Sequence, residues 1–514
     1  MKKIFSLVLC FLLCLGVFAG CGEEKKGSGS GVFSVGFGRA DVTPTTSVPL
    51  DGYQGTQAAQ YRWSDSTSWP FYALCIAFTD GAGNTVLVMT LDMLNAYMAD
   101  SMREVVSKET GVPKSNIMFH CTHNHSGPSL RIDSPDVTNY LTQLTNGVMS
   151  AAKMAMEDRK PVTGMQTTYA RPEQCNSERH YLLADGSYQS YDVGSVPKDQ
   201  LIGHYGVADN LLQLVKFTRE GGKDVMMVNW QGHPPGGETL FTATANYPGV
   251  LRNYLETNLG CEAMFVLGGS GNLNNSSQIA GEIRHDNYQQ LGQNLGAAAV
   301  EATANFTDRK IDNIRVKEKQ LLLTNRDGGA AKVWIYAISI GDLVFVTAPF
   351  EIFDDNAVAV RESSPYAMTM YASCCNGSNG YLPTPPSFGW EITYESRTTN
   401  FPQGTAELVE SELKGLVSEM ASESGYTAVE KPEDYYQGEF EPKTDGVTYQ
   451  LLTFGKAENV RKVENDFYAF QAVGEMNKVR NFLTNDPAIA EKVVSMTTAQ
   501  FLFNEQNVIV GIVE

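Results

Sequence analysis

The 514-residue sequence has few basic residues and no local cluster of them. Its 39 Lys and Arg residues are outnumbered by 58 Asp and Glu residues, so the formal net charge is −19 at pH 7. A chain with this charge would repel a phosphate backbone, and we therefore expect no nucleic-acid partner. With 42% hydrophobic residues it is ordinary globular material, long enough for one large domain and a smaller one.

Cysteine pairs with zinc-binding spacing are also missing. Six cysteines follow Cys21, and none of them forms a CxxC motif, which argues against a cysteine zinc site. The adjacent Cys374 and Cys375 could oxidise with other partners after export, but an even count alone does not show pairing. Most of the six are expected to be small buried residues.

The first residues have the pattern of an export signal. A positive stretch (1–3) precedes an apolar run (4–18) that is too short for a spanning helix, and Ala19-Gly20-Cys21 follows. This resembles a bacterial lipoprotein signal, with Phe18 where leucine is usual, and Cys21 would be acylated. An ordinary secretory signal is the alternative. We expect a signal peptide (1–20), a Gly/Ser-rich tether (21–31) and a lipid-anchored protein at the bacterial cell surface or periplasmic face.

Apolar periodicity predicts alternating strands and helices from residue 32 to about residue 430. Expected strands are 73–78, 85–91, 116–121, 225–230, 263–267 and 343–347. Expected helices are 98–108, 137–157, 288–303 and 405–422. Beyond residue 430 the composition changes, and a strand at 447–454, a short helix around 475–482 and a strand at 508–513 indicate a small α+β module (431–514).

Only seven histidines occur in the chain, and three fall within FHCTHNHSGPSL (119–130). If 116–122 is a strand, its two-residue period directs His123 and His125 to the same side just beyond its end. Two imidazoles at this spacing are a natural first half of a zinc site. His120 is out of phase and is expected to be structural. Packing of all three histidines is the alternative.

Two further polar side chains follow buried strands in the same way. His233 in NWQGHPPGG comes after 225–230, and Glu351 in VFVTAPFEIF comes after 343–347. Sites in mixed α/β domains usually lie on loops just past the carboxyl ends of strands. A carboxylate in apolar surroundings is costly unless it is paired or bound to metal. Two histidines and one carboxylate satisfy the minimum for a catalytic zinc site.

A series of collinear motifs is similar to the neutral/alkaline ceramidase family and its bacterial relatives. The motifs are GFGRADVTP (36–44), PLDGY (49–53), VLVMTLDML (86–94), THNHSGPS (122–129), NWQGH (229–233), GGSGNLNN (268–275), APFE (348–351) and GYLPTPPSF (380–388). THxHSGP is the most specific of them, and together they span about 400 residues. The resemblance implies a mixed α/β catalytic domain (32–430), with central β-sheets flanked by helices, that acts as a zinc amidohydrolase on N-acyl sphingoid lipids.

Carried over residue by residue, the resemblance implies four zinc ligands: His123, His233, Glu351 and Tyr381. Tyr381 cannot be identified without the family, because by itself it is a loop aromatic beside Gly380. His125 would be catalytic, as a hydrogen-bond donor to the substrate or to the developing oxyanion. Zinc lowers the pKa of its bound water to about 7 and polarises the carbonyl group.

The glycine-rich run at 268–275 departs from the family. Ceramidases carry a Gly-Asp-Val-Ser-Pro-Asn type stretch with an essential serine, whereas here Asn274 stands at the serine position and Asn272 at the acidic one. An amide cannot act as nucleophile or base, so a mechanism that needs this serine is unavailable. Asn274 could still orient an oxyanion or a polar substrate group. A tight structural turn is the alternative for this loop.

Arg179, His180 and Ser270 are further candidates for substrate binding. The first two belong to a polar loop (171–185), for which a solvated surface is the alternative. Tyr394-Glu395 resembles a second family segment and could support the pocket wall. Ser270 is also a candidate nucleophile, although Gly268 to Asn272 does not complete a GxSxG elbow.

The favoured function is zinc-dependent hydrolysis of an amide bond in an N-acylated, ceramide-like lipid by a metal-activated water. Two alternatives stay open: a surface-anchored binding protein of the same fold that has lost turnover, and a hydrolase of a different amide or ester. A serine esterase that uses Ser270 is the least supported reading.

Overall fold

The structure is a computed structural model that describes residues 31–52, 61–183, 188–189, 198–279, 282, 287–384, 386–389, 393–436, 452–454, 457–463, 467–473, 479–496, 499–503 and 508–513. The predicted signal peptide and the acylated Cys21 lie outside these residues, as does all but the last residue of the tether. None of the described helices has the length and apolar character that crossing a membrane requires.

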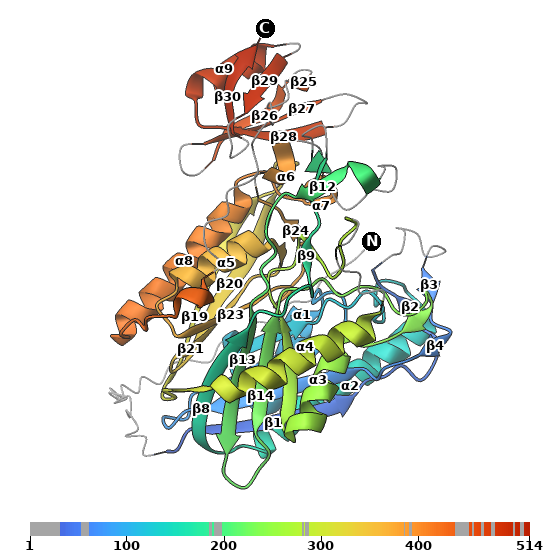
Figure 1. The fold of residues 1–514 in the computed structure, drawn as a ribbon, viewed down its shortest axis with the longest axis vertical. Coiled ribbons are helices and arrows are strands. Elements are labelled where there is room, and N and C mark those ends of the chain that lie inside the picture. The colour runs from blue at the N-terminus through green and yellow to red at the C-terminus, as the bar shows by residue number, and fades with distance from the viewer. Residues whose placement is uncertain are drawn as a thin grey trace, which may run out of the picture.

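The large domain is built on a nine-stranded mixed sheet (Figure 1). Eight strands follow the order β16-β14-β13-β8-β1-β5-β6-β7, and β18 pairs with β8. Two neighbouring pairs, β6–β7 and β14–β16, are parallel. The strands are β1 (Ser34–Asp41), β5 (Tyr72–Thr79), β6 (Thr85–Leu91), β7 (Ile117–Cys121), β8 (Lys160–Ala170), β13 (Leu212–Arg219), β14 (Val225–Trp230), β16 (Glu262–Leu267) and β18 (Thr307–Arg309).

A second, four-stranded sheet packs against one face of the first. Its order is β19-β20-β21-β23, with bounds Ile314–Thr324, Ala330–Ile340, Leu343–Thr347 and Met368–Ala372. Alternation along β5 shows how the layers form. Leu74, Ile76 and Phe78 share a core with residues of the second sheet, whereas Ala73, Cys75 and Ala77 share a core with helices. The result is a four-layer αββα arrangement.

Helices cover the outer faces of both sheets. The first sheet is covered by α1 (Ala99–Thr110), α2 (Pro135–Glu157), α3 (Asn246–Leu259) and α4 (Tyr288–Ala302). The second sheet is covered by α5 (Asp354–Ser363) and α8 (Thr405–Ser424). The four helices predicted before residue 430 are confirmed to within a few residues. Their ends follow local signals: Ser134 caps α2, and Gly111 ends α1 in the left-handed conformation.

Short elements outside the two large sheets form small sheets and helices of their own. These are β2 (Pro49–Leu50), β3 (Arg62–Trp63), β4 (Ser66–Thr67), β9 (Ser177–Glu178), β10 (Tyr181–Leu183), β11 (Tyr188–Gln189), β12 (Leu201–His204), β15 (Thr242–Ala243), β17 (Leu273–Asn274), β22 (Glu351–Ile352), β24 (Tyr381–Leu382), α6 (Pro386–Gly389) and α7 (Tyr394–Thr398). Together with the predicted strands, which are confirmed, they give the expected mixed α/β fold.

The C-terminal residues form a small α+β unit next to α6 (Figure 1). It contains β25 (Leu452–Phe454), β26 (Ala457–Lys462), β27 (Tyr468–Val473), β28 (Val479–Thr484), α9 (Pro487–Ser495), β29 (Ala499–Phe503) and β30 (Ile509–Val513). The helix expected around 475–482 is wrong in its described part. Residues 479–484 form β28, which pairs with β27 and places Phe482 against Phe470, and the helix begins later, at Pro487. The boundary at residue 430 stays a prediction.

Candidate metal centre

The candidate site lies where the carboxyl ends of parallel strands from both sheets come together. His123 follows β7, His233 follows β14, and Ser270 follows β16 in the first sheet. Glu351 follows β21, which runs parallel to β23 in the second sheet. A backbone hydrogen bond from Ser373 to the Leu267 carbonyl (3.0 Å) joins the two edges. The strand-end positions predicted from sequence are thereby confirmed.

Three imidazoles converge at this junction. Ligand atoms of His123, His125 and His233 all lie within 4.8 Å of one another. The Nε2 atoms of His125 and His233 are 2.8 Å apart, and the ring centroids of His123 and His233 are 4.6 Å apart. The three side chains come from two loops, one with His123 and His125 and the other with His233, and they are largely buried. This group can hold a metal ion.

Backbone carbonyls orient two of the imidazoles. The Nδ1 atom of His123 is 2.9 Å from the Leu94 carbonyl oxygen, and that of His233 is 3.2 Å from the Ser270 carbonyl oxygen. A carbonyl can only accept, so each Nδ1 carries a hydrogen and each Nε2 is turned towards the centre. Histidine ligands of metals are held by their second nitrogen in this way.

The convergence of His123 and His125 does not arise from strand alternation. β7 ends at Cys121, and His123 has φ of +60°, a left-handed conformation that turns the chain. The expected common direction is correct, but a tight loop produces it. His120 lies inside β7, buried, and its Nε2 accepts a hydrogen bond from the Leu267 backbone, as expected of a structural histidine.

Glu351 and Tyr381 stand side by side at the centre. They are register partners on the short parallel strands β22 and β24. The Glu351 Oε2 atom is 3.2 Å from His123 Nε2. Burial opposes ionisation of Glu351, but His123 and a hydrogen bond from Tyr381 outweigh it and lower the pKa of the carboxyl. Burial and the neighbouring Glu351 raise the pKa of Tyr381 well above its usual value, so the phenol keeps its proton.

The protonation states suit metal binding. Burial, followed by the nearby charges of His123 and Arg179, lowers the pKa of His125 and of His233 well below the usual value. Both are therefore neutral imidazoles, the form that binds metal. Burial disfavours a charged His123, but Cys374 and Glu351 outweigh it and raise the pKa of this imidazole well above its usual value, so a proton lies between His123 Nε2 and Glu351 Oε2, which are 3.2 Å apart. A divalent cation would take the place of that proton. These residues fit a divalent cation.

His125 is positioned by backbone contacts of its own. Arg62 donates to the His125 carbonyl oxygen (3.0 Å). Gly52, with φ of +106°, approaches so closely that a Cβ there would lie 2.8 Å from the His125 Cβ. Glycine is therefore required at position 52 if the imidazole is to keep its place.

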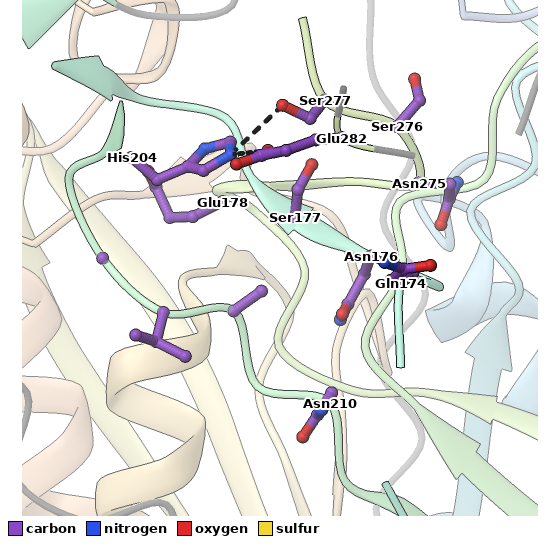
Figure 2. Close-up of a pocket in the computed structure, with 13 residues that line it drawn as sticks. Gln174, Asn176, Ser177, Glu178, His204, Asn210, Asn275, Ser276, Ser277 and Glu282 are labelled. Atoms are coloured by element: carbon purple, nitrogen blue, oxygen red, sulfur yellow. Dashed lines mark hydrogen bonds and ion pairs between the residues drawn. The ribbon is translucent and has the colours of Figure 1, made fainter. Parts of the chain in front are cut away.

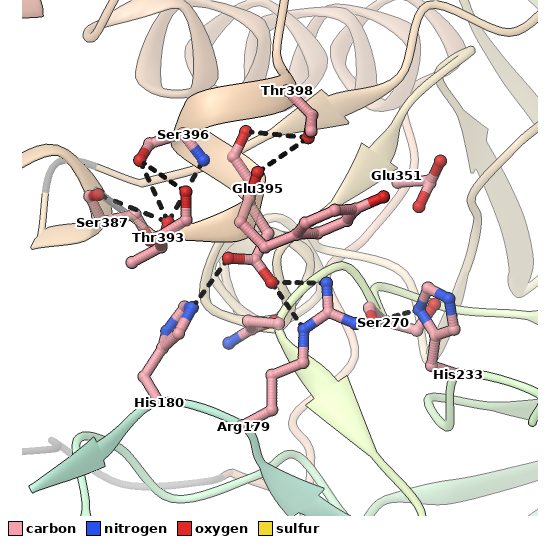
Figure 3. A network of polar contacts seen from close by, with 12 residues as sticks. Arg179, His180, His233, Ser270, Glu351, Ser387, Thr393, Glu395, Ser396 and Thr398 are labelled. Atoms are coloured by element: carbon pink, nitrogen blue, oxygen red, sulfur yellow. Dashed lines mark hydrogen bonds and ion pairs between the residues drawn. The ribbon is translucent and has the colours of Figure 1, made fainter. Parts of the chain in front are cut away.

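Arg179 and His180 belong to a buried charge network with Glu395 (Figure 3). Arg179 Nε donates to Glu395 Oε1 (2.6 Å), and its guanidinium carbon lies 5.5 Å from the centre of the Tyr381 ring. His180 contacts Glu395 Oε2 (3.1 Å) through Nε2 and Glu178 Oε1 (2.8 Å) through Nδ1. All four charged residues are buried. The solvated-loop alternative for Arg179 and His180 is wrong, and Glu395 does support the wall around Tyr381.

The glycine-rich loop contributes in a different way from the candidate roles. Ser270 meets His233 through its backbone carbonyl. Asn272 bonds to Asp354 at the start of α5, and its carbonyl accepts from the Arg179 backbone (2.9 Å). Asn274 lies in β17, half-buried, where its backbone pairs with Ser177. Among the described contacts, no hydrogen bond joins the Asn274 side chain to the histidine group, and its catalytic role stays a prediction.

Sequence reasoning missed Cys374 as part of this environment. Its Sγ atom is 3.4 Å from His123 Nδ1, on the side of the ring away from Glu351. The signal was available, since Cys374 follows the buried strand β23 as His123 follows β7. The six cysteines of the described chain are buried and free, as expected of small core residues.

Two solved ceramidase structures share this fold. One is neutral ceramidase from Pseudomonas aeruginosa, with a TM-score of 0.61 and 15% sequence identity over 86% of this chain and 84% of that chain. The other is a ceramidase complexed with C2, with a TM-score of 0.61 and 13% identity over the same shares. No protein-family model and no curated protein matches the sequence. The chain therefore has the fold of the neutral ceramidases, and the fold that the motif resemblance implies is confirmed.

Proposed function

We propose that this protein is a zinc-dependent hydrolase that cleaves the amide bond of an N-acylated, ceramide-like lipid. The observation that carries the proposal is the convergence of three buried imidazoles with the Glu351 carboxylate and the Tyr381 phenol on a ceramidase fold. Histidine nitrogens and a carboxylate oxygen are the donor set that zinc prefers in hydrolases. A bound zinc ion would polarise the amide carbonyl as a Lewis acid and would supply a water with a pKa of about 7.

In this proposal His123, His233, Glu351 and Tyr381 hold the metal. His125 and Arg179 supply hydrogen bonds to charge that develops on the carbonyl oxygen, because both groups face the centre from a buried position. The Arg179 guanidinium contributes to the low pKa values of His125 and His233, which places its positive charge near both rings. Glu395 holds the Arg179 side chain in position by accepting its hydrogen bond. His123 and the hydrogen bond that Tyr381 donates keep the Glu351 carboxylate ionised.

The proposed substrate class, a ceramide-like lipid, is that of the ceramidases whose structures this chain resembles. We further propose that the chain is exported and held at the membrane through acylated Cys21, which would place the site close to lipid substrates.

Metal analysis and hydrolysis assays test the function. Purified protein should contain about one equivalent of zinc, and His123→Ala should lose it. Wild type should hydrolyse short-chain N-acyl sphingosines faster than N-acyl amino acids. An enzyme that is active only on the amino acid derivatives would keep the metal-dependent amidohydrolase but refute the lipid substrate.

A second candidate is a binding protein that keeps the metal without turnover. Asn274 favours it, since an amide stands at the family's serine position and no described contact brings its side chain to the histidines. Zinc in the protein together with no hydrolysis of any amide or ester tested would select this reading.

A further inference from the structure

A second cavity of about 440 Å³ lies outside the histidine group (Figure 2). Its wall is formed by β9, by the residues that follow β17 (275–277) and by the segment that follows β12. One end holds His204, whose Nε2 is 2.7 Å from Glu282 Oε2 and 3.2 Å from the Ser277 hydroxyl. The volume is in the range of small-molecule sites.

The amide groups that line the cavity are oriented by the protein itself. Asn176 donates both Nδ2 hydrogens, to the backbone carbonyls of Asp209 (2.8 Å) and Gln231 (2.9 Å). Asn210 accepts from Arg171 through Oδ1 (2.8 Å). In each amide one polar atom is held by the protein and the other is available to a ligand. The available atoms are the acceptor Oδ1 of Asn176 and the donor Nδ2 of Asn210. Such fixed, alternating groups are pre-organised for a ligand.

Two buried polar atoms of the lining have no partner among the described residues. They are the Ser177 hydroxyl oxygen and Oδ1 of Asn275, whose residue is only 7% exposed. Asn275 Nδ2 donates a hydrogen bond to the His233 carbonyl. This bond holds the amide in the orientation in which its Oδ1 atom has no hydrogen-bond partner among the described residues. A buried polar atom without a partner is costly, and natural proteins keep one where a ligand or ordered water completes it.

The charges of the lining select against an anion. None of the described lining residues is Lys or Arg, whereas Glu178 and Glu282 are both present. Glu178 is paired with His180 and Glu282 with His204. An anionic group would have no cation to meet there and would lie beside two carboxylates.

We propose that this cavity binds an uncharged, hydroxyl-rich group of the size of a monosaccharide or a polyol. Such a ligand offers adjacent donors and acceptors to Asn176, Ser177, Asn210 and Asn275. The proposal does not depend on metal-dependent hydrolysis, because the cavity lies outside the histidine group.

Saturation-transfer NMR on the full chain tests the proposal, with D-glucose, N-acetyl-D-glucosamine and myo-inositol as probes. At least one probe should receive saturation at millimolar concentration. Ser177→Ala should weaken its binding about fivefold, the effect of one neutral hydrogen bond. The same variant should raise the Tm of the ligand-free protein, since it removes a buried hydroxyl without a partner. Ala208→Phe, which fills the cavity, should abolish binding.

Two controls separate this site from the rest of the molecule. Ser422→Ala, on the exposed face of α8, should change neither binding nor Tm. His123→Ala should keep probe binding while it loses metal. The proposal is overturned if no probe binds, if glucose 6-phosphate binds as well as glucose, or if Ala208→Phe keeps full binding. It is also overturned if Ser177→Ala lowers the Tm and leaves affinity unchanged, because the hydroxyl would then be purely structural.

Discussion

Asn272 and Asp354 exchange two hydrogen bonds across 82 positions of sequence. Asn272 Nδ2 donates to Asp354 Oδ1 (2.6 Å), and its Oδ1 accepts from the Asp354 backbone (2.9 Å). An amide can do both, whereas a carboxylate at position 272 could only accept. The departure from the family's acidic residue therefore has a structural reason: it ties the glycine-rich loop to the start of α5.

We expect Asn272→Asp to destabilise the protein. The new carboxylate would face Asp354, whose pKa burial and the neighbouring Asp355 already raise well above the usual value. Loss of a hydrogen bond and a second buried negative charge should together cost about 2–4 kcal/mol at pH 7, measured by urea unfolding. Asn274→Asp, at a half-buried position of the same loop, is the matched control and should cost less than about 1 kcal/mol. Equal losses would refute this role of Asn272.

Alanine variants of the three histidines should differ in zinc content, because two of the histidines are proposed metal ligands and His125 is not. His123→Ala and His233→Ala each remove an imidazole whose Nδ1 a carbonyl holds, and both should abolish stoichiometric zinc. His125→Ala should keep zinc and lower kcat at least tenfold, since the residue is expected to stabilise charge. Elemental analysis after dialysis, together with kinetics, makes the distinction. His204→Ala, outside the group, is the control, and loss of zinc in His125→Ala would make His125 a ligand.

The buried pair of Arg179 and Glu395 should show strong coupling. Arg179→Met leaves the Glu395 carboxylate buried with His180 as its remaining cationic contact, and about 3–5 kcal/mol of stability should be lost. The double variant Arg179→Met/Glu395→Leu should recover part of that loss, because neither charge is then left alone. Chemical denaturation of the wild type, both single variants and the double variant gives the coupling energy. Additive losses would show that the two side chains act independently.

The local sequence pattern is sufficient to predict the candidate site residues that follow strands. It is insufficient to predict the residues that contact them. His123, His233 and Glu351 each follow an apolar run, and that pattern predicts both the strand and the position of the side chain. Tyr381 lies in a two-residue strand that exists only because it pairs with β22, so no local signal identifies it. The contact of Arg179 with Glu395 joins residues 216 positions apart. Only the resemblance, or the fold itself, brings such pairs together.

The same limit explains the errors in secondary structure. The helix predicted around 475–482 overlaps residues 479–484, but pairing with β27 makes these residues a strand, because cross-strand burial of Phe482 overrides helical spacing. The long hairpin of β19 and β20 has many exposed positions, so its apolar signal is weak and it does not stand out in the sequence. Strand alternation predicts that His123 and His125 point to the same side. That direction is correct, but the chain is not extended there, since His123 has a left-handed backbone conformation.

The stability of the protein should fall as pH rises, through His180. Burial disfavours the charged imidazole, but Glu178 and Glu395 outweigh it and raise the pKa of His180 to about 10. Because the unfolded value is about 6.5, the folded state binds the additional proton between these two pH values. The stabilisation is complete below about pH 6.5 and is lost as the pH rises towards 10, with a slope of at most about 1.4 kcal/mol per pH unit. Urea unfolding of wild type and His180→Gln from pH 6 to 10 measures this difference. The variant should show a shallower decline than wild type, whereas parallel curves would mean that His180 is not the group that titrates.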